Sequence, residues 1–141
     1  MSRTDEIIAY AREIRDFLRT RDPFRIAEYY GIRLSFRNGG AGLFKAQTIR
    51  MEKYPTVICI NENYTLLSQK ILCAHELGHA LMHDGVNYFD ITQRNVRRDE
   101  EYEANLFAVA LLFDDTDFNI PIRAMNNATL LFVLEHNIIT K

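Results

Sequence analysis

The sequence predicts an α+β domain in which several helices pack on a short, mostly antiparallel three-stranded sheet. Apolar residues recur at helical spacing in several segments, and the period changes to alternation near residue 32. The chain has 141 residues, a length that favours a single domain over residues 1–141. The helix that contains His75 is expected to be central, because apolar segments precede and follow it.

Five helices are expected from apolar periodicity and from residues that favour helix ends. Thr4, followed by two acidic residues, predicts the start of the first helix. Asp22 and Pro23 predict the start of a second, and Gly31 its end. The others are expected over about 65–83, 100–113 and 126–135, and Gly85 is predicted to follow the first of these.

Three strands are expected between residues 32 and 60. Ile32, Leu34 and Phe36 alternate with polar residues, which is typical of a half-buried strand. Residues 42–50 are predicted as a second strand after a turn at 38–40, and the β-branched run 56–60 as a third. Such short connections predict mostly antiparallel pairing.

Composition restricts the classes of partner and the compartment. The net charge is −2, so no overall positive field attracts nucleic acid or an anionic membrane. The first residues form no apolar signal segment, and no run approaches the ~20 apolar residues of a membrane span. Cys59 and Cys73 lie in apolar runs and are expected as reduced, buried thiols. These features predict a cytoplasmic protein without a direct nucleic-acid or membrane partner.

Three of the four histidines fall within nine residues, beginning with His75-Glu76-Leu77-Gly78-His79. At about 100° per helical residue, His79 lies near ~40° from His75, His83 near ~80° and Glu76 near ~100°. All four therefore share one helix face, and the apolar residues of the segment lie elsewhere. Two imidazoles one turn apart can supply two ligands to Zn²⁺, and the H-E-x-x-H spacing is typical of a zinc peptidase.

A catalytic zinc site needs a third protein ligand, and the next helix offers carboxylates for it. With Glu103 at zero, Glu100 lies near ~60°, so periodicity leaves both residues open as the ligand. Glu101 lies near ~160° and is expected not to be the ligand; Asn105, near ~200°, is expected to give structural support. His136 stands near the end of the chain and is expected to be a helix-terminus residue.

The histidine motif with His83, and the segment Glu103-Ala104-Asn105-Leu106-Phe107-Ala108, resemble the ImmA/IrrE family of small bacterial and phage metallopeptidases. The resemblance covers about residues 20–113, including the Asp22-Pro23…Gly31-Ile32 unit. It implies a zincin-like fold and Glu103 as the third zinc ligand. It also implies cleavage of a helix-turn-helix transcriptional repressor, as an anti-repressor of a prophage or integrative element.

The predicted site thus has His75, His79 and Glu103 as ligands of Zn²⁺ and Glu76 as the catalytic acid–base group. The developing oxyanion needs a donor besides the metal, and His83, Tyr88 and Tyr102 are candidates. His83 could equally support a ligand or serve as a cation at the helix C-terminus.

A second class of function remains open at this point. The chain could be a zinc-containing regulatory binding module that acts on a DNA-binding partner without proteolysis. The small size of the chain favours this alternative, because it leaves little room for a deep specificity cleft. The presence of Glu76 argues against it, since a purely structural zinc site needs no general base.

Overall fold

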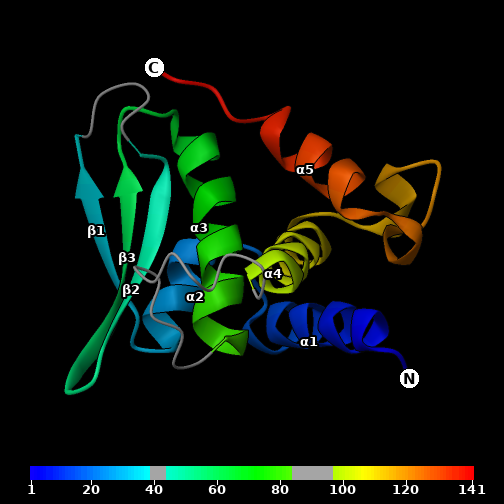
Figure 1. Ribbon diagram of the computed structural model, residues 1–141, viewed down its shortest axis with the longest axis horizontal. Coiled ribbons are helices and arrows are strands. Elements are labelled where there is room, and N and C mark those ends of the chain that lie inside the picture. Colours follow the sequence, from blue (N-terminus) through cyan, green and yellow to red (C-terminus); the bar gives the residue numbers. More distant parts are fainter. Residues whose placement is uncertain (39–43, 84–96) are drawn as a thin grey trace.

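The computed structural model describes residues 1–38, 44–83 and 97–141, without the side chain of Arg97, and confirms the α+β class (Figure 1). The elements follow the order α1 (Arg3–Leu18), α2 (Pro23–Tyr29), β1 (Arg33–Arg37), β2 (Ala46–Met51), β3 (Tyr54–Asn61), α3 (Leu66–Met82), α4 (Arg97–Leu112) and α5 (Asn127–Glu135). Two 3-10 helices, η2 (Asp115–Asp117) and η3 (Ile122–Ala124), join α4 to α5.

The sheet is mixed, with the strand order β1-β3-β2. β2 and β3 form the expected antiparallel hairpin, in which Thr48 lies opposite Ile58. β1 pairs with the other edge of β3 in parallel, with Leu34 opposite the same Ile58. The sequence predicted mostly antiparallel pairing from the short connections between strands, and those connections do not indicate that β3 lies between β1 and β2. Most of the turn predicted at 38–40 falls outside the described residues.

Side chains that accept backbone hydrogen bonds set the starts of the helices. Asp22 caps α2 as the sequence predicted, and Thr65 and Asn126, which the sequence predicted only as approximate helix starts, cap α3 and α5. The first helix begins one residue before Thr4, because Ser2 Oγ accepts the hydrogen bond from the Asp5 amide. α4 begins three residues before the predicted start at 100, and Gly85 lies outside the described residues.

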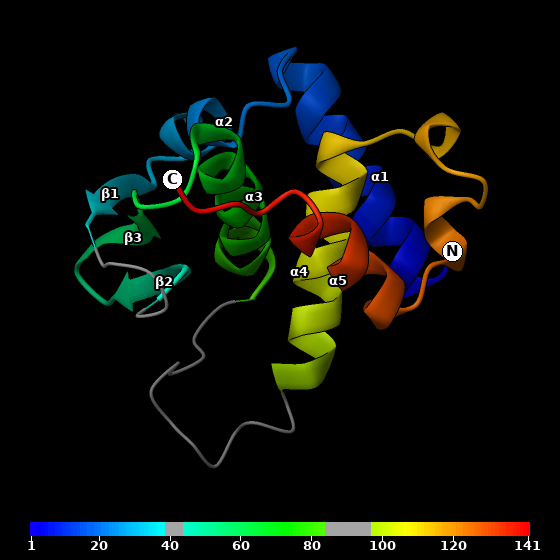
Figure 2. The ribbon, with the colours of Figure 1, turned by 90° about the horizontal axis from the view of Figure 1, so that it is seen from above.

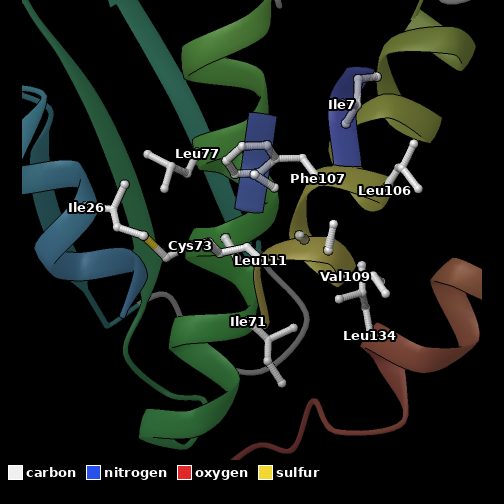
Figure 3. Close-up of a cluster of buried hydrophobic side chains, with 14 of the residues drawn as sticks. Ile7, Ile26, Ile71, Cys73, Leu77, Leu106, Phe107, Val109, Leu111 and Leu134 are labelled. Carbon is white, nitrogen blue, oxygen red and sulfur yellow. The ribbon is translucent and has the colours of Figure 1, made fainter. Parts of the chain in front are cut away.

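α3 lies between the sheet on one side and α4 on the other, as the prediction of a central motif helix requires (Figures 1 and 2). α1 packs on the far side of α4, and α5 crosses it as well. Residues 104–111 of α4 are accordingly buried around the whole helix. Figure 3 shows Phe107 of α4 in one cluster with Leu77 of α3 and Ile7 of α1.

Cys73 is fully buried within this core, and burial raises the pKa of its thiol. Cys59 is half-buried, and both cysteines are free, as the sequence predicted. None of the helices in the described part of the chain has the length and apolarity that a membrane span requires.

The residues after α5 bind to the first turn of α3. Ser68 Oγ accepts a hydrogen bond of 2.7 Å from the Ile139 amide, and the Thr65 amide donates to the Ile139 carbonyl at 2.9 Å. Tyr64 and Thr140 form an isolated antiparallel bridge. α5 is thereby held beside the start of α3.

Gly78 sets the distance between α3 and α4. A Cβ at this position would lie 3.1 Å from the Cα and 3.3 Å from the carbonyl oxygen of Ala104, and 3.3 Å from Cβ of Phe107. The first two atoms belong to the backbone of a buried helix, so they cannot turn aside as a flexible side chain would. A hydrogen in place of a side chain at Gly78 therefore allows the two helices to meet.

We expect Gly78→Ala to lower the free energy of unfolding by about 1–3 kcal/mol, the usual cost of overpacking a core. Without the contact, alanine would stabilise the helix by up to ~1 kcal/mol, so the sign of the change tests the packing. Denaturant unfolding measures it, with the exposed Leu67→Ala on the same helix as the control. A Gly78→Ala protein more stable than the wild type would refute this account.

Candidate metal centre

Two imidazoles of α3 converge on one carboxylate of α4. His75 Nε2 lies 3.2 Å from Glu101 Oε2, and His79 Nε2 lies 2.8 Å from Glu101 Oε1. The His79 side chain is buried and that of His75 nearly so, whereas the Glu101 side chain is half exposed. The three residues form one of two groups among the described residues that could hold a metal ion.

The donor set and spacing of this group fit zinc. Two imidazole nitrogens and a carboxylate oxygen are a ligand set of catalytic zinc sites, which leave the fourth position to water. At zinc–ligand distances of ~2.0–2.1 Å, tetrahedral ligand atoms lie about 3.4 Å apart. The nitrogen–oxygen distances of 2.8 and 3.2 Å need only small adjustments to reach that value.

Asn105 supports His75 from one turn further along α4. Its carboxamide interacts with the His75 ring, and its Nδ2 donates to Asn127 Oδ1 at 2.9 Å. Asn105 Oδ1 is buried and has no hydrogen-bond partner among the described residues. A His75 ring that binds a metal through Nε2 carries its proton on Nδ1, for which Asn105 Oδ1 is an available acceptor.

The electrostatics of the group reflect the close contact of imidazole and carboxylate. Burial of His75 opposes its charged form, but the hydrogen bond to Glu101, the charges of Glu76 and Glu101 and the contact with Asn105 outweigh it and raise its pKa. Burial likewise opposes the charged form of Glu101, and its hydrogen bonds to His75 and His79 outweigh that effect and lower its pKa. Protons and a metal ion therefore compete for the same nitrogens.

Glu76 projects from α3 beside the ligand group, with one carboxylate oxygen fixed. Thr48 Oγ1, on β2, lies 2.9 Å from Glu76 Oε1 and 3.2 Å from the Glu76 carbonyl oxygen, and it can donate to either. Glu76 Oε2 lies 3.8 Å from His75 Nε2. Thr48 is buried, and no motif in the sequence singles it out; its place in a predicted strand is the signal that could have indicated burial.

The other two glutamates of α4 meet His83 or its surroundings instead. Glu103 Oε1 lies 2.9 Å from His83 Nε2, and Glu103 also binds the guanidinium of Arg3. The hydrogen bond from Arg3, together with His83, lowers the pKa of Glu103 against the smaller effect of burial. Glu100 belongs to the second possible metal group, with His79 and His83, and its Oε2 is buried without a partner among the described residues.

The side-chain positions thus favour Glu101 as the third ligand, whereas the sequence favoured Glu103 and set Glu101 aside. Angles around α4 relate its glutamates to one another, but they do not say which side of the helix faces α3. The side of α4 that faces α3 therefore could not be predicted from periodicity, and the choice of Glu103 came from the family resemblance. In the structure, Glu101 reaches both histidines of the motif and Glu103 reaches the third.

The three candidates for an oxyanion donor differ in what the structure says of them. His83 Nδ1 lies 3.0 Å from His79 Nδ1, on the side of the His79 ring away from Glu101, so it is placed to support a ligand. The hydroxyl of Tyr102 is hydrogen-bonded to Thr4 Oγ1 of α1 at 3.0 Å. Tyr88 lies outside the described residues.

His136 stacks on Phe132 at the end of α5, far along the chain from the motif.

A cavity of about 310 Å³ adjoins the ligand group. Its polar lining includes His75, Glu76, Glu101 and Asn105. Its apolar lining comes from β2, from α3 and from α5 with the residues that follow it: Ala46, Ile71, Leu72, Leu131, Leu134 and Ile138. His75 and Glu101 are therefore reached from a space that has one apolar side.

Comparison with known proteins identifies the class to which this fold and site belong. The peptidase family M78, described as the IrrE N-terminal-like domain, matches residues 27–130, and the chain belongs to this metallopeptidase family. The resemblance to ImmA/IrrE proteins is thereby confirmed.

The chain is also similar to "Uncharacterized immunity region protein 2" of Bacillus phage phi105, with 32% identity over 102 residues. The match covers 69% of this chain and 61% of the phage protein, so the chain spans about three fifths of the length of that relative. The comparison with solved structures gives no match.

We expect Glu101→Gln to weaken zinc binding more than Glu103→Gln and Glu100→Gln do, because the structure places Glu101 against both motif histidines. The loss should exceed the ~10–100-fold that residues supporting a ligand contribute. Competition with a chromophoric chelator measures the three affinities. If Glu103→Gln abolished binding and Glu101→Gln did not, the assignment from the family resemblance would be right.

Proposed function

We propose that this chain is a zinc-dependent metallopeptidase that cleaves a protein substrate. The observation that carries the proposal is the convergence of His75 and His79 on Glu101, with Glu76 beside them and a cavity in front. Membership of a metallopeptidase family supports it. His75, His79 and Glu101 would hold Zn²⁺, and Glu76 would act as the acid–base group.

Zinc, when bound, supplies a Lewis acid and lowers the pKa of a water ligand towards ~7. Glu76 Oε2 accepts the proton of the attacking water and then delivers it to the leaving amine. Thr48 holds Oε1 of the same carboxylate, so the basic oxygen keeps one position through both transfers. His75, with Asn105 behind it, and Glu101 keep the ligand geometry.

A helix-turn-helix transcriptional repressor is the substrate we propose, with this chain acting as an anti-repressor in the cytoplasm. The family resemblance supports this choice, as does the phage relative, whose name places it in an immunity region. The edge strand β2 lies beside α3 and could bind an extended segment of substrate through its main chain. The apolar side of the cavity would accept an apolar side chain next to the cleaved bond.

Glu76→Gln tests the catalytic role, because it keeps the size of the side chain and removes the base. Zinc content and thermal stability should persist, and cleavage of the cognate repressor should fall by at least ~10²-fold. His79→Ala is the matched control, since a ligand variant should lose metal and activity together. Repressor cleavage and a reporter for repression are the measurements.

If Glu76→Gln still relieved repression as well as the wild type, proteolysis would not be the mechanism. A regulatory binding module, which acts by holding its DNA-binding partner, would then be the better description.

Thr48→Val removes the hydroxyl that holds Glu76 and keeps the shape of the side chain. We expect zinc binding to stay unchanged and the rate of cleavage to fall about 10-fold or more, because a carboxylate that is free to turn spends less time in the reactive position. Thr48→Ser retains the hydroxyl and should retain most of the rate. Equal rates for the valine and serine variants would show that the contact has no role in catalysis.

A further inference from the structure

A row of contacts runs from the metal ligand His79 to the start of α1. His79 Nδ1 lies 3.0 Å from His83 Nδ1, and His83 Nε2 lies 2.9 Å from Glu103 Oε1. Arg3 then binds Glu103 through two hydrogen bonds, Nε to Oε2 at 2.9 Å and Nη2 to Oε1 at 3.2 Å. Both histidine side chains are 5% exposed, so the row lies in the interior until it reaches Arg3.

The chemistry of the row determines where its hydrogens lie when His79 binds a cation through Nε2. Glu103, held by a guanidinium, only accepts hydrogen bonds, so His83 Nε2 carries a hydrogen and donates it. A neutral His83 then has a bare Nδ1, which accepts. The hydrogen between the two rings consequently belongs to His79 Nδ1, and the lone pair of His79 is on Nε2, the atom that faces Glu101.

We propose that His83, Glu103 and Arg3 form a positioning relay that holds His79 in the tautomer and orientation needed to bind zinc. This inference rests on the zinc site proposed above and concerns residues outside the ligand set. Each motif histidine would then have a partner on its second nitrogen, Asn105 for His75 and His83 for His79.

The position of Arg3 supports a role beyond general stability. It lies in the first turn of α1, where the helix dipole disfavours a cation. An exposed ion pair contributes little to stability, and the Arg3 side chain is 57% exposed. The partner Glu103 is only 17% exposed, and the adjacent hydrogen bond between Thr4 and Tyr102 fixes the same turn of α1 against α4. The ion pair is thus built to orient Glu103 towards His83.

His83 could instead be a metal ligand. In the second possible metal group, His79, His83 and Glu100 would bind an ion together. His79 and His83 face each other through Nδ1, so this ion would take the place of the hydrogen between the rings. The relay and the second group therefore predict opposite results for a residue that keeps the hydrogen bonds of His83 and cannot replace it as a zinc ligand. Glutamine is such a residue, because its amide oxygen can accept from His79 and its amide nitrogen can donate to Glu103.

The experiment compares His83→Leu and His83→Gln, with the exposed His136→Leu as the control for removing a histidine. Zinc affinity is measured by chelator competition, and Co²⁺ replaces zinc for the visible spectrum, which reports ligand geometry and not stability. Under the relay, His83→Leu weakens zinc binding about 10–100-fold and changes the cobalt spectrum. His83→Gln restores both to near wild-type values, and Glu103→Gln and Arg3→Ala weaken binding to smaller degrees.

Wild-type zinc affinity and an unchanged cobalt spectrum in His83→Leu would overturn the relay alone. Loss of zinc in His83→Gln equal to that in His79→Ala would also overturn it, because His83 would then be a ligand. A wild-type protein that bound no zinc would overturn the proposed function and the relay with it. Thermal unfolding of each variant, measured alongside, shows that the compared proteins are folded at the temperature of the titration.

Discussion

The approach of α3 to α4 at Gly78 is the constraint on which the metal centre depends. The motif histidines lie on one helix and their carboxylate partners on another, so the distance between the helices sets every contact between them. A methyl group at residue 78 would meet the backbone of Ala104, next to Glu103. The glycine of the H-E-L-G-H segment is therefore part of the geometry of the site, although it carries no functional group.

Once the helices meet, the acidic turn of α4 divides its carboxylates among the histidines of α3. Glu101 lies against His75 and His79, and Glu103, about half a turn of helix away, lies against His83. One carboxylate thus belongs to a group that could hold a metal ion, and another lies against the third histidine. The same helix surface supplies Asn105 behind His75, so α4 contributes both to the metal centre and to its surroundings.

Features that depend on residue spacing within one helix or strand could be predicted from the sequence. Features that depend on how two elements pack together could not. The cap at Asp22, the starts of α3 and α5 to within a residue, the helix of His75 and the burial of Cys73 follow from local pattern and were predicted. The parallel pairing of β1 with β3 joins strands that are not adjacent in the sequence, so no local pattern predicts it. The position of Glu101 depends on the rotation of α4 about its axis, which is set by the packing of a helix that is buried on all sides over residues 104–111.

The residues that hold the site in place come from three separate elements, α1, β2 and α5. Thr48 and Arg50 of β2 hold Glu76 and the last turn of α3, since Arg50 Nη2 donates to the carbonyl of His79 at 3.1 Å. Arg3 of α1 holds Glu103, and Asn127 of α5 holds Asn105. A metal ion that binds only the assembled ligands adds its binding free energy to the stability of the fold. Each proposed ligand or its neighbour is held from a different part of the chain, so the geometry of the candidate centre depends on how α1, β2 and α5 pack on α3 and α4. The arrangement of the candidate metal centre therefore depends on the packing of the whole domain.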